Sequence, residues 1–406
     1  MPNVVDRFNV GGEEYHIEPV LVTEPIEDSP NGITSGGVYQ ALQDSSPLVN
    51  PSLRAKVFGK YIGSAFRATP VPDIFSPTDW PSWSDAAGDV LVIGTGQRGP
   101  IWTDDNCESW HAVFDYTSGN INVNYLKCVH GVWFVSVYFS NGNVYTYYSL
   151  DGRVWAQTNL PDQVDCVDYG LGVFVAAVKS NKGLWWSEDG ITWTASNVST
   201  GTEKSVAYGQ SFYDSHEKRF MTAHYYSLDG KNWSNMGSTP SKLDAIAYGA
   251  GVWLGADATN NKFYRGGMGH SWDEITGVTI PGSSSTGTST DIIFAAGIFV
   301  ITVQSRAMFI ARPDLKSSVS APVLTSYEGP RHIAYKNGMF VGGFRWSNEG
   351  YVWHEAAVFD TNMQDLWPML ENVTRNMAFY KGRWISVWHE YVYTGDFEAA
   401  VAAGNI

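Results

Sequence analysis

The sequence predicts an all-β protein, a β-propeller of four-stranded blades preceded by a small N-terminal segment. A short apolar strand, a turn that often contains glycine, and a second apolar strand carrying an aromatic residue recur about every 42 residues. The phrase Ser-x-Asp-Gly-x-x-Trp occurs three times between Tyr147 and Trp233. Aromatic residues make up 14% of the 406 residues, which suits a protein rich in strands.

The recurring pair of apolar strands predicts the number of blades, because a repeat of this length with four short strands is typical of a propeller blade. The turn between the two strands falls at eight places: Gly88, Gly131, Gly172, Lys218, Gly251, Gly297, Gly338 and Gly382. Eight turns predict eight blades, and seven is the alternative if the first belongs to an incomplete sheet. Little chain follows Asp396. The last strand therefore comes either from residues 397–401 or from residues 56–67, which would close the ring across the termini.

Each Ser-x-Asp-Gly-x-x-Trp phrase predicts a strand, a tight reversal and a second strand that opens with tryptophan. The aspartate can accept hydrogen bonds from the N–H groups of the turn, and glycine takes a positive φ at low cost. The tryptophan supplies a large apolar face for burial. These features predict a structural role, not a binding role, for Ser149, Asp151, Gly152, Trp155, Ser187, Asp189, Gly190, Trp193, Ser227, Asp229, Gly230 and Trp233.

The phrase resembles the Asp-box of the sialidase and BNR-type β-propellers. Residues 103–110, Thr-Asp-Asp-Asn-Cys-Glu-Ser-Trp, resemble a fourth copy in the longer spacing, with Cys107 where that form usually has glycine. In that family the boxes lie away from the ligand site, so the resemblance implies a fold and not an activity. The blades after the third good copy are expected to have lost the box.

The chain is predicted to divide into an N-terminal segment and linker, residues 1–75, and the propeller, residues 76–406. An acidic stretch with two prolines at residues 23–30 leads into Asn-Gly-Ile-Thr-Ser-Gly-Gly-Val-Tyr-Gln-Ala-Leu at residues 31–42. The latter resembles a phrase common in phage tail-fibre and other virion-appendage proteins, with glycine and isoleucine in place of the usual proline and valine. The resemblance implies a virion location and attachment to other virion proteins.

Within this phrase, Thr34 or Ser35 can cap a short helix on which Val38, Tyr39 and Leu42 form one apolar stripe. So short a helix needs a partner. Two alternatives remain open: the helix packs against its own chain, or it serves in homo-oligomerisation or docking.

A formal net charge of −15 argues against nucleic acid and anionic membranes as partners. No apolar run approaches ~18 residues, so no membrane insertion is expected. The N-terminus lacks a basic-then-apolar secretion signal, which predicts synthesis in the host cytoplasm before assembly into the virion. The three cysteines have no metal-ligand spacing, and no phosphate-binding glycine loop is present, so no metal and no cofactor are predicted.

A binding site is expected at the end of the propeller opposite the Asp-boxes, because that end carries the less regular loops. The later blades keep arginines and aromatic residues at or near those loops, and an arginine beside a tryptophan suits sugar rings or acidic glycans. The alternative for each of these residues is packing between blades. The predicted ligand-binding residues are Arg306, Arg345, Trp346, Trp367, Trp388 and His389.

Three functions follow from these patterns. The favoured one is a bacteriophage virion appendage, a tail fibre or receptor-binding protein whose propeller binds a glycan or protein of the host surface. The first alternative is a purely structural virion decoration, such as a head fibre or collar protein. The second is a sialidase-type glycan hydrolase, which resembles this chain in its boxes, but the phrase Arg98-Gly99-Pro100 departs from that family's Arg-Ile-Pro. The sequence therefore predicts no catalytic residues.

Overall fold

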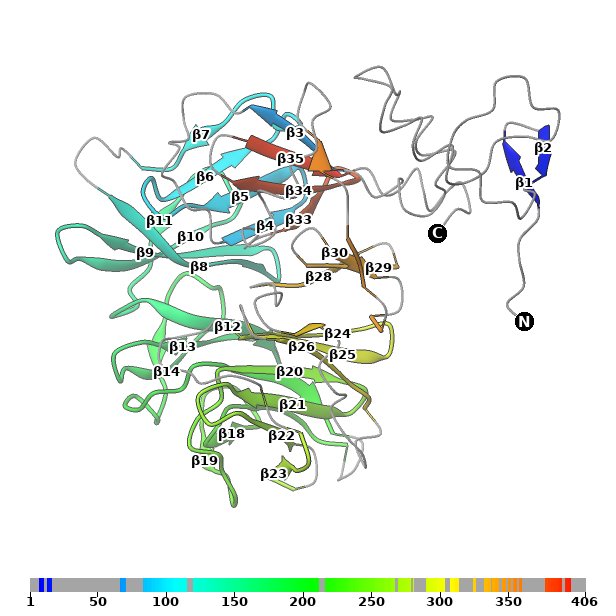
Figure 1. Cartoon of the computed structure of the whole chain (residues 1–406). Helices are drawn as coiled ribbons and strands as arrows, with labels where there is room; N and C mark the ends of the chain where they lie inside the picture. Colours follow the sequence, from blue (N-terminus) through cyan, green and yellow to red (C-terminus); the bar gives the residue numbers. More distant parts are fainter. Residues whose placement is uncertain are drawn as a thin grey trace.

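The fold is seen in a computed structural model that describes residues 7–10, 13–16, 66–70, 83–114, 120–211, 216–266, 269–278, 280, 290–303, 307–313, 324–325, 332–336, 338–342, 345–347, 350–351, 353–355, 358–359, 377–388 and 391–395. Over these residues the chain forms strands and loops without a helix. Eight sheets follow one another around a ring (Figure 1), and the first strands of successive sheets pack against each other. The all-β class and the propeller fold are confirmed.

Seven of the sheets contain four antiparallel strands in chain order, and the eighth contains five. The first strands are β4 (Trp83–Ala87), β8 (Ile121–Val129), β12 (Val164–Gly170), β16 (Ala207–Gln210), β20 (Ala245–Gly249), β24 (Thr290–Ala295), β28 (Ala334–Lys336) and β33 (Ala378–Tyr380). The second strands are β5 (Val90–Gly94), β9 (Val132–Phe139), β13 (Val173–Val178), β17 (Lys218–Met221), β21 (Val252–Asp257), β25 (Ile298–Val303), β29 (Met339–Gly342) and β34 (Arg383–Trp388).

The third strands are β6 (Pro100–Thr103), β10 (Val144–Ser149), β14 (Gly183–Ser187), β18 (Tyr225–Ser227), β22 (Lys262–Gly266), β26 (Ala307–Ala311), β30 (Arg345–Ser347) and β35 (Tyr391–Gly395). The fourth strands of the first seven sheets are short: β7 (His111–Ala112), β11 (Ala156–Gln157), β15 (Thr194–Ala195), β19 (Ser234–Asn235), β23 (Trp272–Ile275), β27 (Leu324–Thr325) and β31 (His354–Glu355). Near the N-terminus, β1 (Arg7–Val10) and β2 (Glu13–His16) form a separate two-stranded sheet.

The eighth sheet is completed by chain from the N-terminal side. Strand β3 (Phe66–Pro70) pairs antiparallel with β35 in the position of a fourth strand, and β32 (Val358–Phe359) adds parallel to β3. Closure across the termini is the second of the two predicted alternatives. Because β3 lies inside the segment that we assigned to residues 1–75, the propeller begins earlier in the chain than residue 76.

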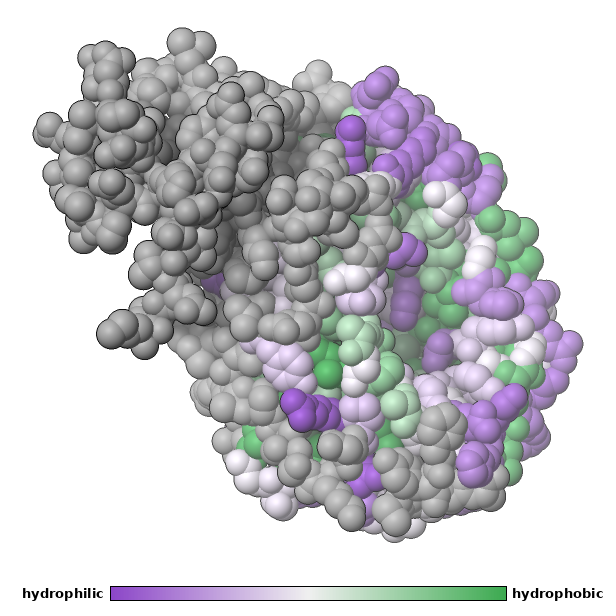
Figure 2. All heavy atoms as spheres, turned by 90° about the vertical axis from the view of Figure 1, so that its right-hand side faces the viewer, coloured by the Kyte–Doolittle hydropathy of each residue, from purple (hydrophilic) through white to green (hydrophobic). Residues whose placement is uncertain are grey.

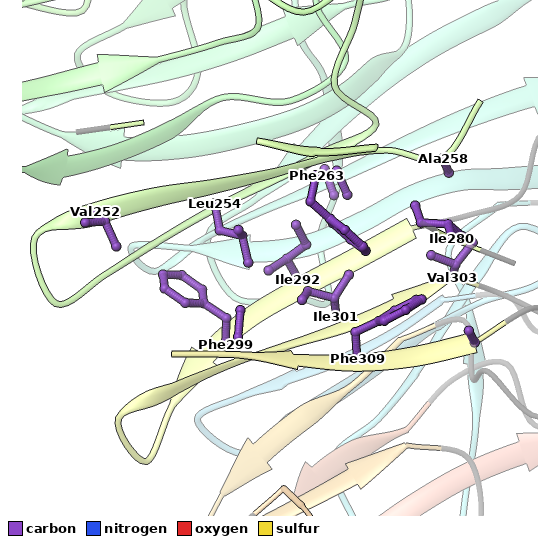
Figure 3. Packing of buried hydrophobic residues seen from close by; sticks show 14 residues of the cluster. Val252, Leu254, Ala258, Phe263, Ile280, Ile292, Phe299, Ile301, Val303 and Phe309 are labelled. Atoms are coloured by element: carbon purple, nitrogen blue, oxygen red, sulfur yellow. The ribbon is translucent and has the colours of Figure 1, made fainter. Parts of the chain in front are cut away.

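The second strands form the core of the ring because neighbouring blades cover both of their faces. Every residue of β5, β13, β21 and β25 is buried, as expected for short and continuous apolar runs. Figure 3 shows the interface between the fifth and sixth sheets, where Phe263 and Phe309 meet edge to face with ring centroids 5.1 Å apart. Burial of each large side chain contributes roughly 1.5–3 kcal/mol, so these interfaces hold the blades together.

Some glycines at the ends of the first strands are required by the close approach of the next blade. A Cβ atom on Gly170 would lie 2.2 Å from the ring of Tyr208, and one on Gly209 would lie 2.1 Å from the ring of Tyr248. Neither glycine has a positive φ, so turn geometry does not require them. They are required because a larger side chain would have no room beside the aromatic ring. Each supplies a flat surface on which an aromatic ring of the following blade lies.

The three Ser-x-Asp-Gly turns share one hydrogen-bond pattern. In the second of them, the Ser187 hydroxyl donates to Asp189 Oδ1 (2.8 Å) and accepts from the N–H of Gly190 (2.8 Å). Asp189 Oδ1 also accepts from the N–H groups of Ile191 (2.7 Å) and Thr192 (2.8 Å). The turns at Asp151 and Asp229 repeat these bonds within 0.2 Å. The predicted structural role agrees with this geometry.

Two further turns extend the pattern. Asp105 accepts hydrogen bonds from Thr103, Glu108 and Ser109, and Cys107 adopts a positive φ of 69° at the position where glycine is usual. In the seventh sheet, Ser347 Oγ accepts from the N–H of Gly350. The Trp353 indole N–H donates to the Gly350 carbonyl at 2.7 Å. The seventh sheet thus keeps part of the turn, although its sequence lacks the aspartate of the box.

We predict that a chain starting at residue 73 unfolds at a lower temperature than a chain starting at residue 56. The shorter chain lacks β3, so the backbone of β35 becomes an unpaired edge. The chain from residue 56 keeps β3 and serves as the control, which should melt like the full-length protein. Differential scanning calorimetry makes the comparison, and identical melting of the two chains would contradict ring closure by β3.

We predict that Asp189→Ala lowers the free energy of unfolding by about 1 kcal/mol at neutral pH, because two turn N–H groups lose their acceptor. Partial desolvation raises the pKa of Asp189, but the hydrogen bonds from Thr192, Ile191 and Ser187 outweigh it and lower the pKa overall. The stabilisation is therefore present above about pH 4 and is lost as the pH falls through the lower pKa of the folded state.

Urea unfolding of wild type and variant at neutral and acidic pH measures this effect. Asp273→Ala removes an exposed carboxylate of β23 and is the matched control, with little expected change. An Asp189→Ala protein that is as stable as the wild type at neutral pH would show that water replaces the carboxylate without cost.

Candidate functional site

The first strands of the sheets surround a central channel with a volume of about 460 Å³. Figure 2 shows a hollow among the described atoms, with hydrophilic and hydrophobic residues both present at its wall. Residues from all eight first strands, or from the segments just before them, line the channel. The propeller thus places side chains from distant parts of the sequence around one cavity, which makes the channel the candidate functional site.

Lys127 on β8 is the central charged group of the channel. Its side chain is exposed to the channel although protein surrounds it, and its ammonium group donates no hydrogen bond to any described residue. Desolvation lowers the pKa of Lys127, but the nearby Cys166 sulfur and the carboxylates of Asp168, Asp85 and Asp291 outweigh it and raise the pKa overall. The lysine is therefore positively charged at neutral pH, with three hydrogen-bond donors facing the channel.

Asp85 on β4 and Asp168 on β12 each bridge to the next blade through hydrogen bonds to its backbone. Asp85 Oδ2 accepts from the N–H of Cys128 at 2.7 Å, and Asp168 Oδ2 accepts from the N–H of Tyr208 at 2.7 Å. The other oxygen of each carboxylate accepts from the N–H of the following residue at 2.9 Å. Burial raises the pKa of both carboxyl groups, and these N–H groups partly offset the rise.

An aromatic group forms another part of the wall. The ring of Trp83 lies against His332, with centroids 4.5 Å apart, and against Tyr125, with centroids 5.5 Å apart. His332 Nδ1 lies 3.5 Å from Asp291 Oδ2, which also accepts from the N–H of Ile333 at 3.2 Å. Desolvation raises the pKa of Asp291, but the interaction with His332 and this N–H outweigh it and lower the pKa overall.

Some polar atoms of the lining have no partner within the protein. Among the described residues, Ser84 Oγ, Thr290 Oγ1 and His332 Nε2 are buried and make no hydrogen bond. Buried polar groups are usually paired, so three such atoms around one cavity are unusual. The channel wall therefore carries more hydrogen-bonding capacity than the fold itself uses.

The mouth of the channel away from the Ser-x-Asp-Gly turns is bordered by ion pairs. Asp244 Oδ1 lies 3.1 Å from Lys204 Nζ and 3.0 Å from Lys242 Nζ. Asp165 Oδ1 lies 3.5 Å from Lys179 Nζ. These residues lie at or just before the start of a first strand, or in the loop after a second strand. Because first and second strands are antiparallel, these positions are at the same end of the ring. The charges at this end are paired, in contrast to Lys127.

A second polar cluster lies in the fourth sheet. The carboxylate of Glu203, which is 3% exposed, lies 2.6 Å from His224 Nδ1 and accepts from the N–H of Ala223 at 3.0 Å. The hydrogen bond to Glu203 raises the pKa of His224, and partial desolvation opposes it. The pair ties the segment before β16 to the turn between β17 and β18.

The structure places the predicted ligand-binding residues as follows. Arg345 and Trp346 belong to strand β30, not to a loop, and they are 7% and 2% exposed. Trp388 is the last residue of β34. Arg306, Trp367 and His389 lie outside the described residues. Arg345 and Trp346 do not line the channel, and the role of the six residues in binding stays a prediction.

The sequence contains a signal for the channel residues, although none of them was among the predicted site residues. Asp85, Lys127 and Asp168 each lie two residues before the end of a first strand. Their separations of 42 and 41 residues follow the repeat, so a charged side chain recurs at the same place in three successive first strands. An alignment of the repeats by strand would have placed the three side chains at one level of the ring.

Among the described residues, no group of three histidine, cysteine, aspartate or glutamate side chains is arranged to hold a metal ion. The same residues contain no helix of the length and apolarity needed to cross a membrane. The Asn31–Leu42 phrase lies outside the described residues.

Comparisons with known proteins concern the fold. No protein-family model and no curated protein sequence matches the chain. The computationally designed Ika8 protein is similar in structure, with a TM-score of 0.51 and 8% identity over 78% of this chain and 96% of that protein. A streptogramin B lyase gives a TM-score of 0.49 with 11% identity over 81% of this chain and 96% of the lyase. YCF48 from Cyanidioschyzon merolae gives 0.44 with 13% identity over 82% and 99%.

We predict that the Glu203–His224 pair makes stability depend on pH. Because the pKa of His224 is raised, its stabilisation is complete below about pH 6.5 and is lost as the pH rises through the folded-state value. Glu203→Gln keeps an acceptor for the Ala223 N–H but removes the charge, so the gap in melting temperature between wild type and variant should be larger at low than at high pH.

Melting temperatures measured on both sides of neutrality test this. Glu274→Gln breaks an exposed pair with Lys262, and it is the control whose gap should stay constant. A constant gap for Glu203→Gln as well would show that the pair contributes no titrating charge.

Proposed function

We propose that this chain is a bacteriophage virion appendage, a tail fibre or receptor-binding protein, whose propeller binds a glycan or protein on the surface of the bacterial host. The observation that carries the proposal is the order of two parts in one chain. The phrase at residues 31–42, which resembles virion-appendage proteins, precedes a propeller that encloses a polar and aromatic channel. The first part would attach the protein to the particle through other virion proteins, and the second would contact the host.

The Ser-x-Asp-Gly turns support the assignment of the propeller to the Asp-box type. They hold the same hydrogen bonds in three successive blades, and their side chains are used within the turns themselves. The end that carries them therefore serves as the structural end. Binding is assigned to the channel and to its opposite mouth.

A structural virion decoration, such as a head fibre or collar protein, is the second candidate, because the N-terminal phrase supports it equally. A sialidase-type hydrolase has less support. The family's chemistry needs three arginines around the substrate carboxylate, and the described residues that line the channel include lysines and carboxylates but no arginine.

Deletion of residues 1–50 separates these functions. The deletion leaves β3 in place, so the propeller should fold. We expect the fluorescently labelled truncated protein to bind host cells as well as the full chain does, and we expect it to be missing from particles assembled in its presence. Loss of incorporation is measured by immunoblotting of purified virions.

The controls identify the receptor class. Binding that survives protease treatment of the cells but falls after periodate oxidation indicates a glycan, and the reverse indicates a protein. Full-length protein that enters particles but binds no host cell would support the structural decoration instead. Release of free sugar from a labelled surface glycan would support the hydrolase.

A further inference from the structure

We infer that the central channel is a binding site for a neutral mono- or disaccharide, held by Lys127 as hydrogen-bond donor and by Asp85 and Asp291 as acceptors. The inference rests on the proposed function in one respect only: the source of the saccharide is taken to be a glycan of the host surface.

The register of the first strands shows why Lys127 is available for a ligand. Asp85 and Asp168, at the equivalent positions of the neighbouring blades, each bond to the backbone of the next blade. In the second blade that bond comes from Tyr125 instead, whose hydroxyl accepts from the N–H of Val167 at 3.1 Å. Lys127 therefore lies at the strand position that Asp85 and Asp168 have in the neighbouring blades, but it makes no hydrogen bond to the described backbone of the next blade.

The ammonium group of Lys127 is exposed to the channel, so its donors bond to water or to a ligand there. The channel of about 460 Å³ gives Lys127 room for such a ligand, within the range of roughly 300–1,000 Å³ typical of small-molecule sites. The ligand must therefore carry hydrogen-bond acceptors.

The charges around Lys127 indicate that the ligand is neutral. The carboxylates of Asp85 and Asp291 line the channel with Lys127, and together with Asp168 they act on the lysine. An anionic ligand would meet these carboxylates, while a cationic ligand would meet the lysine, so each would be repelled at some part of the wall. A hydroxyl group can accept from the ammonium and donate to a carboxylate at the same time, because each carboxylate oxygen has a second lone pair.

The aromatic wall indicates that the ligand also has an apolar face. Trp83 and Tyr125 line the channel beside Asp85 and Lys127. A sugar ring combines hydroxyl groups on its edge with C–H bonds on its faces, which fits a wall where charged and aromatic side chains alternate. The buried Ser84 Oγ and Thr290 Oγ1, which make no hydrogen bond to the described residues, add polar capacity at the same wall.

Isothermal titration calorimetry on the full-length protein tests the site, with glucose, galactose, rhamnose, N-acetylglucosamine, maltose and lactose as neutral probes and glucuronic acid and sialic acid as acidic ones. We expect at least one neutral probe to bind and both acidic probes to bind more weakly or not at all. Lys127→Met should weaken the binding at least tenfold, about 1.4 kcal/mol. A cooperative melting transition of the variant would show that the loss of binding is not caused by unfolding.

Lys262→Met is the matched control, because that lysine lies on the third strand β22 in an exposed pair with Glu274. Its saccharide affinity should equal that of the wild type. A second readout needs no variant: the saccharide that binds should slow acetylation of Lys127, followed by peptide mass spectrometry, but not that of Lys262.

Three results would overturn the inference: tighter binding of an acidic probe, equal affinity of both lysine variants, or no binding of any neutral probe. In the last case, host cells that still bind the full-length protein would leave the proposed function intact and place its site elsewhere. Failure of both assays would overturn both proposals.

Discussion

The ring depends on one recurring hydrogen bond, in which a side chain on or just before the first strand of one blade accepts from a backbone N–H at the first strand of the next. Such bonds occur at five junctions between described blades: Asp85–Cys128, Tyr125–Val167, Asp168–Tyr208, Ser205–Ile246 and Asp291–Ile333, at 2.7 to 3.2 Å. Each N–H faces the partner blade, where loss of its acceptor would cost about 1–3 kcal/mol. The bond therefore fixes the height of each blade relative to its neighbour.

This bond also determines what the channel can hold. Ser205 precedes β16, but each of the other acceptors lies on a first strand, either two or four residues before its end. Each of these strands therefore uses only one of the two positions for the hydrogen bond to the next blade. Where Tyr125 takes the structural bond, position 127 is free to carry a lysine. The same carboxylates that join the blades surround that lysine and are held by backbone N–H groups. The chemistry of the channel is thus pre-organised by the contacts that close the ring.

The turns and the repeat could be predicted from sequence because their determinants are local. Serine, aspartate, glycine and tryptophan at fixed spacing build the turn with their own atoms, so Asp189 has the partners that its neighbours in sequence imply. The closing strand β3 was only one of two alternatives, because the pairing of residues 66–70 with 391–395 joins the two ends of the chain. The channel was not predicted because its wall forms only when eight distant strands come together.

The placement of Arg345 and Trp346 shows how a single substitution hid a repeat. Ser347, Gly350 and Trp353 form a turn like that of the earlier blades, but Glu349 stands where they have aspartate. Without the aspartate, the sequence pattern does not reveal the turn, and it predicts a loop at Trp346. In register it corresponds to Tyr148 and Trp186, on the third strand one residue before the serine. The turn of the seventh sheet is thus recognised by its serine, glycine and tryptophan.

Closure by β3 has a mechanical consequence for a protein that is anchored through its N-terminal segment. The chain enters the ring at a fourth strand, three strands away from the one that lines the channel. A pull on the N-terminal segment acts first on the pairing of β3 with β35 and only then on β34 and β33. The hydrogen bonds between first strands hold the channel residues in place. The pulling force reaches these bonds only after it has acted on the strand pairings from β3 to β33. Under the proposed function, attachment through the N-terminal segment would therefore leave the channel at the centre of the ring undisturbed.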